Sequence, residues 1–113
     1  MNFVAVFFAG AFLCNAVPHL TAALRGEVFP TPFAKPPTWG PSTPLVNLVW
    51  GATNLVLGLI LIGFYPVAIG LNPEFAVLLA GAFLMGLRLS THFGDARRKG
   101  TFTGEDKNGT LGS

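Results

Sequence analysis

The chain has 113 residues, of which 51% are hydrophobic and only 11% are charged, and its formal net charge at pH 7 is +2. Soluble domains carry about 25% charged residues, so the polar cover that a water-soluble fold needs is missing here, whereas lipid removes that need. The net charge is small and no basic stripe alternates with aromatic residues, so the composition indicates one membrane domain and no nucleic-acid partner.

The first apolar stretch covers residues 3–24. At about 1.5 Å of rise per residue, a helix of this length spans roughly 30 Å, the thickness of a bilayer core. It has no positive segment before it, and the residues ahead of Cys14 are not the small ones that a cleavage site requires, so we expect a mature helix and not a signal peptide. Pro18 is expected to kink its last turn. A single cysteine excludes an internal disulfide and a cysteine-based zinc site.

A proline-rich segment, residues 27–44, follows and is called the strap below. It holds six of the nine prolines, and Phe29, Phe33 and Trp39 make it too apolar for a solvated linker. Prolines this dense exclude a helix and favour polyproline II. The strap is therefore predicted to be extended along the membrane interface, with Trp39 anchored at headgroup depth.

The second and third apolar stretches cover residues 45–65 and 73–93. The third has a clear start, because Asn72 suits the N-cap, Pro73 the first helical position and Glu74 the positive end of the helix dipole. The short connection 67–71 predicts that these two helices form an antiparallel hairpin. The expected fold is an all-α membrane protein with three transmembrane helices in a single domain, residues 1–94, followed by a polar cytoplasmic tail, residues 95–113.

All seven Lys and Arg residues fall on one side of a three-span arrangement, and the opposite side has none. The positive-inside rule then predicts that the strap and the tail are cytoplasmic and that the N-terminus is outside. These cations are Arg25, Lys35, Arg88, Arg97, Arg98, Lys99 and Lys107.

Polar and small residues recur at helical spacing within each apolar stretch. In the second stretch Asn47, Gly51, Asn54 and Gly58 share one face, where an amide facing lipid would leave an unsatisfied polar group. A helix contact is the better interpretation, because glycine lets helices approach and asparagine bonds across the contact. Matching stripes, Asn15 with His19 in the first stretch and Arg88 with His92 in the third, predict a polar layer in the cytoplasmic half of the bundle.

Three of these polar residues have two interpretations each. His19 could bond a free carbonyl near a helix end and His92 could be a solvated end residue, or the two could hold a haem or a metal. Arg88 could extend to lipid phosphates, or it could bind an anionic headgroup or substrate. The cluster Arg97, Arg98 and Lys99 is interpreted as a topology anchor that attracts anionic lipid.

Four short motifs together resemble one group of proteins. These are Asn-Ala-Val-Pro-His at 15–19, Phe-Pro-Thr-Pro-Phe at 29–33, Ser-Thr-Pro-Leu at 42–45 and Trp-Gly-Ala-Thr-Asn at 50–54. Residues 15–58 resemble small three-span bacterial inner-membrane proteins to which no activity is assigned. The resemblance implies a bacterial inner membrane and no particular chemistry.

No phosphate-binding loop, dinucleotide fingerprint, zinc-protease helix or nucleophile elbow is present, so we expect no enzyme. The leading hypothesis is a non-catalytic accessory subunit or self-assembling scaffold, whose partners are membrane lipid and other subunits or copies of itself. One alternative is an oligomeric channel or transporter lined by Asn47 and Asn54. A second alternative is a redox subunit that binds haem or metal through His19 and His92. The sequence predicts no cofactor beyond this alternative.

Overall fold

The computed structural model describes residues 2–100, and over that range it contains three helices, α1 (Phe3–Leu24), α2 (Pro44–Phe64) and α3 (Pro73–Lys99). All three are long and apolar enough to cross a membrane. The chain is therefore all-helical, with the pattern of an integral membrane protein. Residues 1 and 101–113, including Lys107 and most of the predicted tail, lie outside the described residues.

Each helix begins at a side-chain cap. The Asn72 side chain accepts a hydrogen bond from the Phe75 amide at 2.8 Å and Pro73 follows it, as the sequence predicts. Thr43 caps α2 in the same way, accepting from the Val46 amide at 3.2 Å. Proline suits the first helical position because the N–H group that it lacks would have no partner within the helix there.

Glycines in the left-handed region end two of the helices. Gly26, with φ of 68°, follows α1, and the Glu27 amide turns back to donate to the Ala22 carbonyl at 2.9 Å. Gly100, with φ of 67°, ends α3. Left-handed backbone favours glycine because other residues place a Cβ against the carbonyl. The predicted end of the third helix near residue 93 is therefore wrong, since residues 95–99 continue the helix and do not start the tail.

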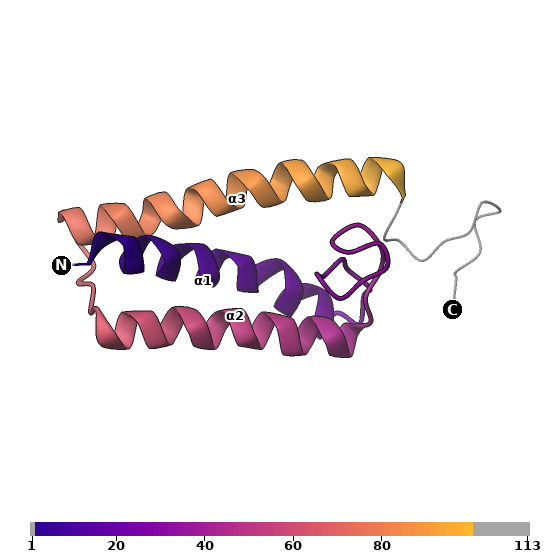
Figure 1. Ribbon diagram of the computed structural model, residues 1–113, viewed down its shortest axis with the longest axis horizontal. Coiled ribbons are helices and arrows are strands. Elements are labelled where there is room, and N and C mark those ends of the chain that lie inside the picture. The colour runs from indigo at the N-terminus through magenta and orange to yellow at the C-terminus, as the bar shows by residue number, and fades with distance from the viewer. Residues whose placement is uncertain (1, 101–113) are drawn as a thin grey trace.

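Helix α1 lies between α2 and α3 and packs against both (Figure 1). In the described part of the chain α2 and α3 make no contact with each other. The predicted hairpin is therefore wrong as a packed pair, although α2 and α3 run in opposite directions. The short connection brings their ends together, but α1 occupies the space between them.

Glycines set how closely α1 approaches its neighbours. A Cβ added at Gly10 would overlap the Leu78 carbonyl oxygen of α3, and one added at Gly81 would overlap the Phe7 carbonyl oxygen of α1. On the other side, a Cβ at Gly51 would lie 2.8 Å from Leu20. Close backbone approach thus joins α1 and α3 near the N-terminus of α1, and the two helices diverge toward the strap (Figure 1).

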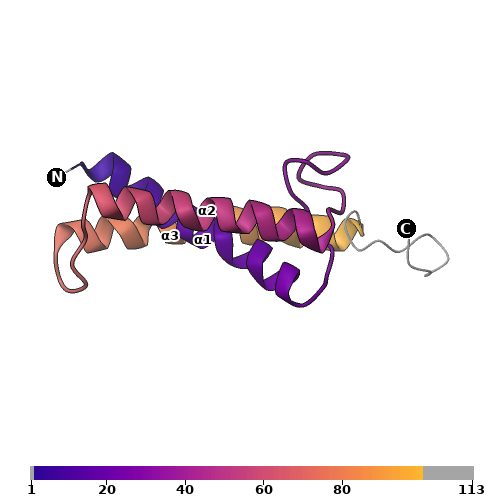
Figure 2. The ribbon, with the colours of Figure 1, turned by 90° about the horizontal axis from the view of Figure 1, so that it is seen from below.

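The strap folds into a closed loop at the end of the bundle that also holds the C-terminus of α3, called the strap end below (Figures 1 and 2). Phe29 and Ser42 exchange backbone hydrogen bonds at 3.2 and 3.1 Å, and their pairing closes the loop. Within the loop the Thr31 and Ser42 hydroxyls lie 2.6 Å apart. The strap is thus not extended along its length, because these bonds satisfy its backbone internally.

Candidate functional site

Asn47 is the centre of the polar contacts at the strap end, and its exposed fraction is 0%. Its side-chain nitrogen lies 2.9 Å from the Phe29 carbonyl oxygen, 3.1 Å from that of Thr43 and 3.3 Å from that of Ser42. Because the amide has only two hydrogens, these three acceptors share them. One side chain of α2 therefore ties both ends of the strap loop to the start of the helix.

His19 joins this group from α1. Its Nδ1 lies 2.8 Å from the Asn47 Oδ1, and its exposed fraction is 2%. Since the Asn47 nitrogen is committed to carbonyl oxygens, the oxygen must face the ring, and Nδ1 of His19 is the donor. The histidine therefore bonds a side-chain amide of α2. One interpretation of the sequence, a bond from His19 to a free carbonyl at the end of its own helix, is wrong.

A second link between α1 and α2 lies on the side of Asn47 away from the strap. Asn15 Nδ2 donates to Asn54 Oδ1 at 2.9 Å, while Asn54 Nδ2 donates to the Trp50 carbonyl oxygen at 2.9 Å. Gly51 and Gly58, which share the face of Asn54, lie against Leu20 and Leu13 of α1. The structure thus brings the predicted stripes of α1 and α2 together.

The predicted stripe of α3 has a different neighbour. His92 Nε2 donates to the Thr38 carbonyl oxygen of the strap at 2.6 Å, and its ring lies 4.3 Å from the Trp39 ring, centroid to centroid. Lys99 adds a cation–π contact, with Nζ 4.8 Å from the Trp39 ring centroid. Trp39, predicted as an interfacial anchor, is therefore packed against α3.

Aromatic residues of the strap reach the other helices. The Phe29 ring lies 5.5 Å from the His19 ring of α1 and 4.4 Å from the Phe93 ring of α3. Phe33 contacts Trp50 of α2 edge-on at 5.5 Å. The strap thus contacts all three helices, and it links α3 to α1 where their backbones diverge.

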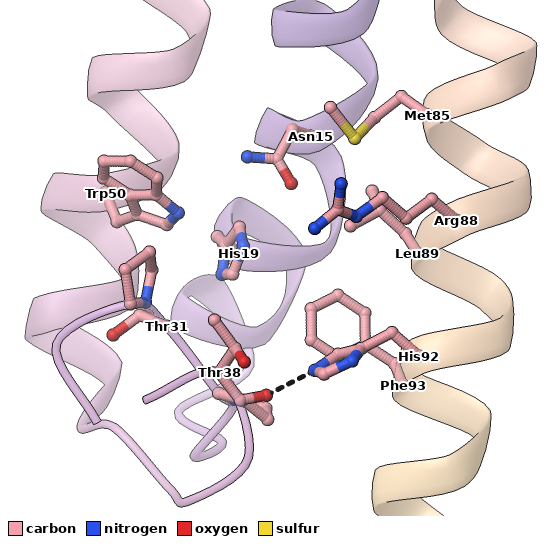
Figure 3. A pocket seen from close by; sticks show the side chains of 12 residues that line it. Asn15, His19, Thr31, Thr38, Trp50, Met85, Arg88, Leu89, His92 and Phe93 are labelled. Atoms are coloured by element: carbon pink, nitrogen blue, oxygen red, sulfur yellow. Dashed lines mark hydrogen bonds between the residues drawn. The ribbon is translucent and has the colours of Figure 1, made fainter. Parts of the chain in front are cut away.

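A pocket of about 330 Å³ lies where the helices diverge, beneath the strap (Figure 3). Its polar lining comes from α1, the strap and α3: Asn15, His19, Thr31, Thr38, Arg88 and His92. Its apolar walls include Trp50, Met85, Leu89 and Phe93. The volume is at the small end of the range of about 300–1,000 Å³ for ligand pockets.

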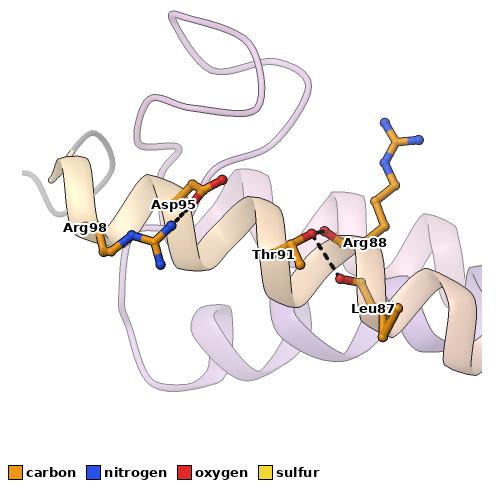
Figure 4. A network of polar contacts seen from close by, with 5 residues as sticks. All are labelled: Leu87, Arg88, Thr91, Asp95 and Arg98. Carbon is orange, nitrogen blue, oxygen red and sulfur yellow. Dashed lines mark hydrogen bonds and ion pairs between the residues drawn. The ribbon is translucent and has the colours of Figure 1, made fainter.

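Arg88 differs from the cations at the end of α3. Arg98 pairs with Asp95, whereas the guanidinium of Arg88 has no ion pair or hydrogen bond to any residue in the described part of the chain. Figure 4 shows Arg88 extending away from that ion pair. Arg97, Arg98 and Lys99 form the last turn of α3, where positive charge favours the helix dipole.

The geometry gives little basis for a metal centre. Among the described residues no group of three or more His, Cys, Asp or Glu side chains is close enough to hold a metal ion. One nitrogen of each histidine is already bonded, Nδ1 of His19 to Asn47 and Nε2 of His92 to Thr38. Ligation by His92 through Nε2 would require the strap to release it.

Sequence reasoning missed the contribution of the strap to this site. Thr31 and Ser42 are buried, and Thr38 supplies both a backbone acceptor and part of the pocket wall. The buried hydroxyls of Thr31 and Ser42 bond each other. Because buried hydroxyls in an apolar segment need hydrogen-bond partners, the composition of the strap was the available signal for this contact.

Comparison of the chain with known protein families, with curated proteins and with solved structures gives no match.

Proposed function

We propose that this chain is a small non-catalytic membrane protein that acts as an accessory subunit or self-assembling scaffold, with α3 as its docking helix. The observation that carries the proposal is a groove along α3, lined by Leu79, Ala82, Phe83, Gly86, Leu87 and Ser90. Ala82, Gly86 and Ser90 recur every four residues and leave a shallow track between large apolar side chains. Small residues at this spacing let a partner helix approach closely in a membrane.

The exposure of α3 supports the same proposal. Only Gly81 and Ala96 of its 27 residues are buried. Phe83 is 68% exposed and Leu87 is 50% exposed, on a face that α1 does not cover. Lipid alone provides no hydrophobic drive to associate helices, so a partner would bind through the shape of this groove.

The expected orientation places the strap end in the cytoplasm. The described cations gather at that end, at the end of α1, on the strap and on the second half of α3, whereas Glu74 lies at the start of α3, at the opposite end (Figure 1). The positive-inside rule applied to this arrangement gives a cytoplasmic strap and an external N-terminus. The bacterial inner membrane follows only from the resemblance of residues 15–58 to small bacterial proteins.

The two alternatives receive less support from the geometry. Asn47 and Asn54 are 0% and 1% exposed and face α1, so they do not line a path between subunits. A histidine-ligated haem would compete with the bonds that His19 and His92 already make.

Site-directed crosslinking in native membranes tests the docking role. In a Cys14→Ser background, Ser90→Cys places a photo-crosslinker in the groove, and Val56→Cys places the same reagent on an exposed face of α2. We expect one defined crosslinked product from position 90 and only weak, heterogeneous products from position 56. Mass spectrometry then distinguishes a second copy of this chain from a different subunit.

A pair of glycine variants provides the control. An added Cβ at Gly86 has only one neighbour, Cys14 Sγ at 3.6 Å, and one at Gly63 has none within 4 Å. Gly86→Ala should therefore leave the fold intact, narrow the groove and weaken the adduct, whereas Gly63→Ala should keep it. If position 90 gave no discrete adduct, or the same pattern as position 56, the docking role would be wrong.

A further inference from the structure

The pocket beneath the strap combines one uncompensated positive charge with apolar walls. Arg88 lies on its rim, and Asn15, His19 and His92 lie around it (Figure 3). No Asp or Glu lines the pocket. The three described acidic residues are elsewhere, since Glu27 pairs with Arg25, Asp95 pairs with Arg98 and Glu74 starts α3. The pocket therefore favours an anion and offers no carboxylate for a ligand cation.

Arg88 is attached to α3 within the expected hydrocarbon core, in the half nearer the strap end. At about 1.5 Å per residue it lies about 21 Å along α3 from Glu74, which is less than the roughly 30 Å of a hydrocarbon core. An arginine there extends toward the interface and seeks an anionic partner. Figure 3 shows its side chain extending from α3 toward α1, between Met85 and the strap.

The walls of the pocket accept a hydrocarbon chain. Trp50 of α2 stands opposite Met85, Leu89 and Phe93 of α3. The pocket lies on the side of the bundle where α1 and α3 diverge. A volume of about 330 Å³ holds a headgroup and its first carbons, so a longer chain would have to leave through that side.

We propose that this pocket binds the oxyanion of a membrane amphiphile, a phosphate or carboxylate held by Arg88, with its hydrocarbon chain lying along the apolar side chains of α2 and α3 that line the pocket. The guanidinium supplies paired donors that match an oxyanion. The site is built within one chain, so it does not depend on a partner protein or on the groove of α3.

Trp50 serves as a reporter because it lines the pocket. Trp39→Phe leaves Trp50 as the one tryptophan, since the chain has two. In nanodiscs of phosphatidylcholine that contain a minor fraction of brominated-chain phosphatidylglycerol, bromine beside Trp50 should quench its fluorescence. We expect stronger quenching than from the same fraction of brominated phosphatidylcholine, because the pocket has no carboxylate that could pair with the cationic choline of that lipid.

Substitution of Arg88 tests its role in the preference for anionic lipid. Arg88→Gln should weaken the preference for the anionic lipid about tenfold or more, because a charged hydrogen-bond donor is lost, and Arg88→Lys should retain part of it. Arg98→Gln is the matched control, since that cation pairs with Asp95 outside the pocket. Circular dichroism verifies that each variant stays helical.

A second pair of variants distinguishes lipid binding in the pocket from simple contact of Arg88 with lipid phosphates at the membrane surface. Leu89→Phe narrows the pocket, whereas Leu84→Phe makes the same change on a 52% exposed position outside it. We expect only Leu89→Phe to reduce quenching. Equal effects of the two variants, or equal quenching by anionic and zwitterionic lipid, would overturn the proposal.

The source of the oxyanion is decided by competition. Addition of a long-chain fatty acid that relieves quenching in the Arg88 form, but not in Arg88→Gln, identifies a carboxylate as a second ligand. Inorganic phosphate should not compete, because it lacks the chain that the apolar walls accept. Displacement by phosphate alone would overturn the amphiphile assignment.

Discussion

The replacement of Asn47 by leucine gives the sharpest test of how the strap is held. Leucine has the same branched side-chain shape and is somewhat larger, so Asn47→Leu removes the hydrogen bonds of the buried amide without opening a cavity. The change leaves the Nδ1 donor of His19 without its acceptor. The Phe29 and Ser42 carbonyl oxygens lose the Asn47 donor, but each still accepts a backbone hydrogen bond from the other residue.

The expected loss follows from the number of bonds. The two amide hydrogens and the oxygen of Asn47 make about three full hydrogen bonds, one to His19 of α1 and the others to strap carbonyls. A side-chain hydrogen bond between membrane helices is worth about 0.6–1.7 kcal/mol, and we apply the same range to each of the three. We therefore expect Asn47→Leu to lower the free energy of unfolding by about 2–4 kcal/mol, including the unsatisfied His19 donor. Asn54→Leu removes one bond between helices and should lower it by about 1 kcal/mol.

Unfolding in mixed micelles by increasing dodecyl sulfate, followed by far-ultraviolet circular dichroism, measures both losses. Emission from Trp39 reports on the strap separately, in a Trp50→Phe background. We expect a red shift in Asn47→Leu and none in Asn54→Leu, because only Asn47 bonds the strap. Equal losses from the two variants, or an Asn47→Leu protein as stable as the wild type, would refute the central role of Asn47.

Three further predictions concern packing, strap docking and topology. Gly81→Ala should destabilise the bundle by about 1–3 kcal/mol in the same unfolding assay, because its Cβ would overlap the Phe7 carbonyl, whereas Gly63→Ala, with open space around it, should not destabilise it. His92→Ala should release Trp39 and increase proteolysis of the strap, since it removes the bond to Thr38; unchanged cleavage would contradict this role. Lys35→Cys, in a Cys14→Ser background, should react with an impermeant maleimide only after the cells are opened, and labelling in intact cells would reverse the proposed orientation.

Hydrophobic length and helical spacing predicted much of the fold from the sequence. The first two apolar stretches and the start of the third, with its Asn72 cap, correspond to the observed helices within one residue, whereas α3 ends six residues later than predicted. The stripe containing Asn47 and Asn54 lies against α1, because buried amides in a membrane must find partners on another helix.

The order of the helices did not follow from local patterns, whereas the end of α3 was predicted too early although the sequence carries a signal for it. The short α2–α3 connection fixes antiparallel direction but says nothing about whether α1 enters between them. Gly94 stays helical, whereas Gly100, after a basic last turn, ends the helix. That combination is itself a recognised C-terminal signal and favours the later glycine. The closed form of the strap is held by its own Phe29–Ser42 pairing and also by Asn47, which lies outside the strap sequence.

The position of the pocket follows from how α3 is attached. Gly10 and Gly81 bring α1 and α3 into backbone contact at one end, and that contact fixes their separation there. At the other end α1 uses its polar side chains on α2, so the strap mediates the link to α3 through His92 and Phe29. A helix held by backbone contact at one end and by a loop at the other must leave space beside the loop, which is where Arg88 lies. Loosening the strap with His92→Ala should therefore weaken the lipid preference that Arg88 provides, while Gly63→Ala should leave it unchanged.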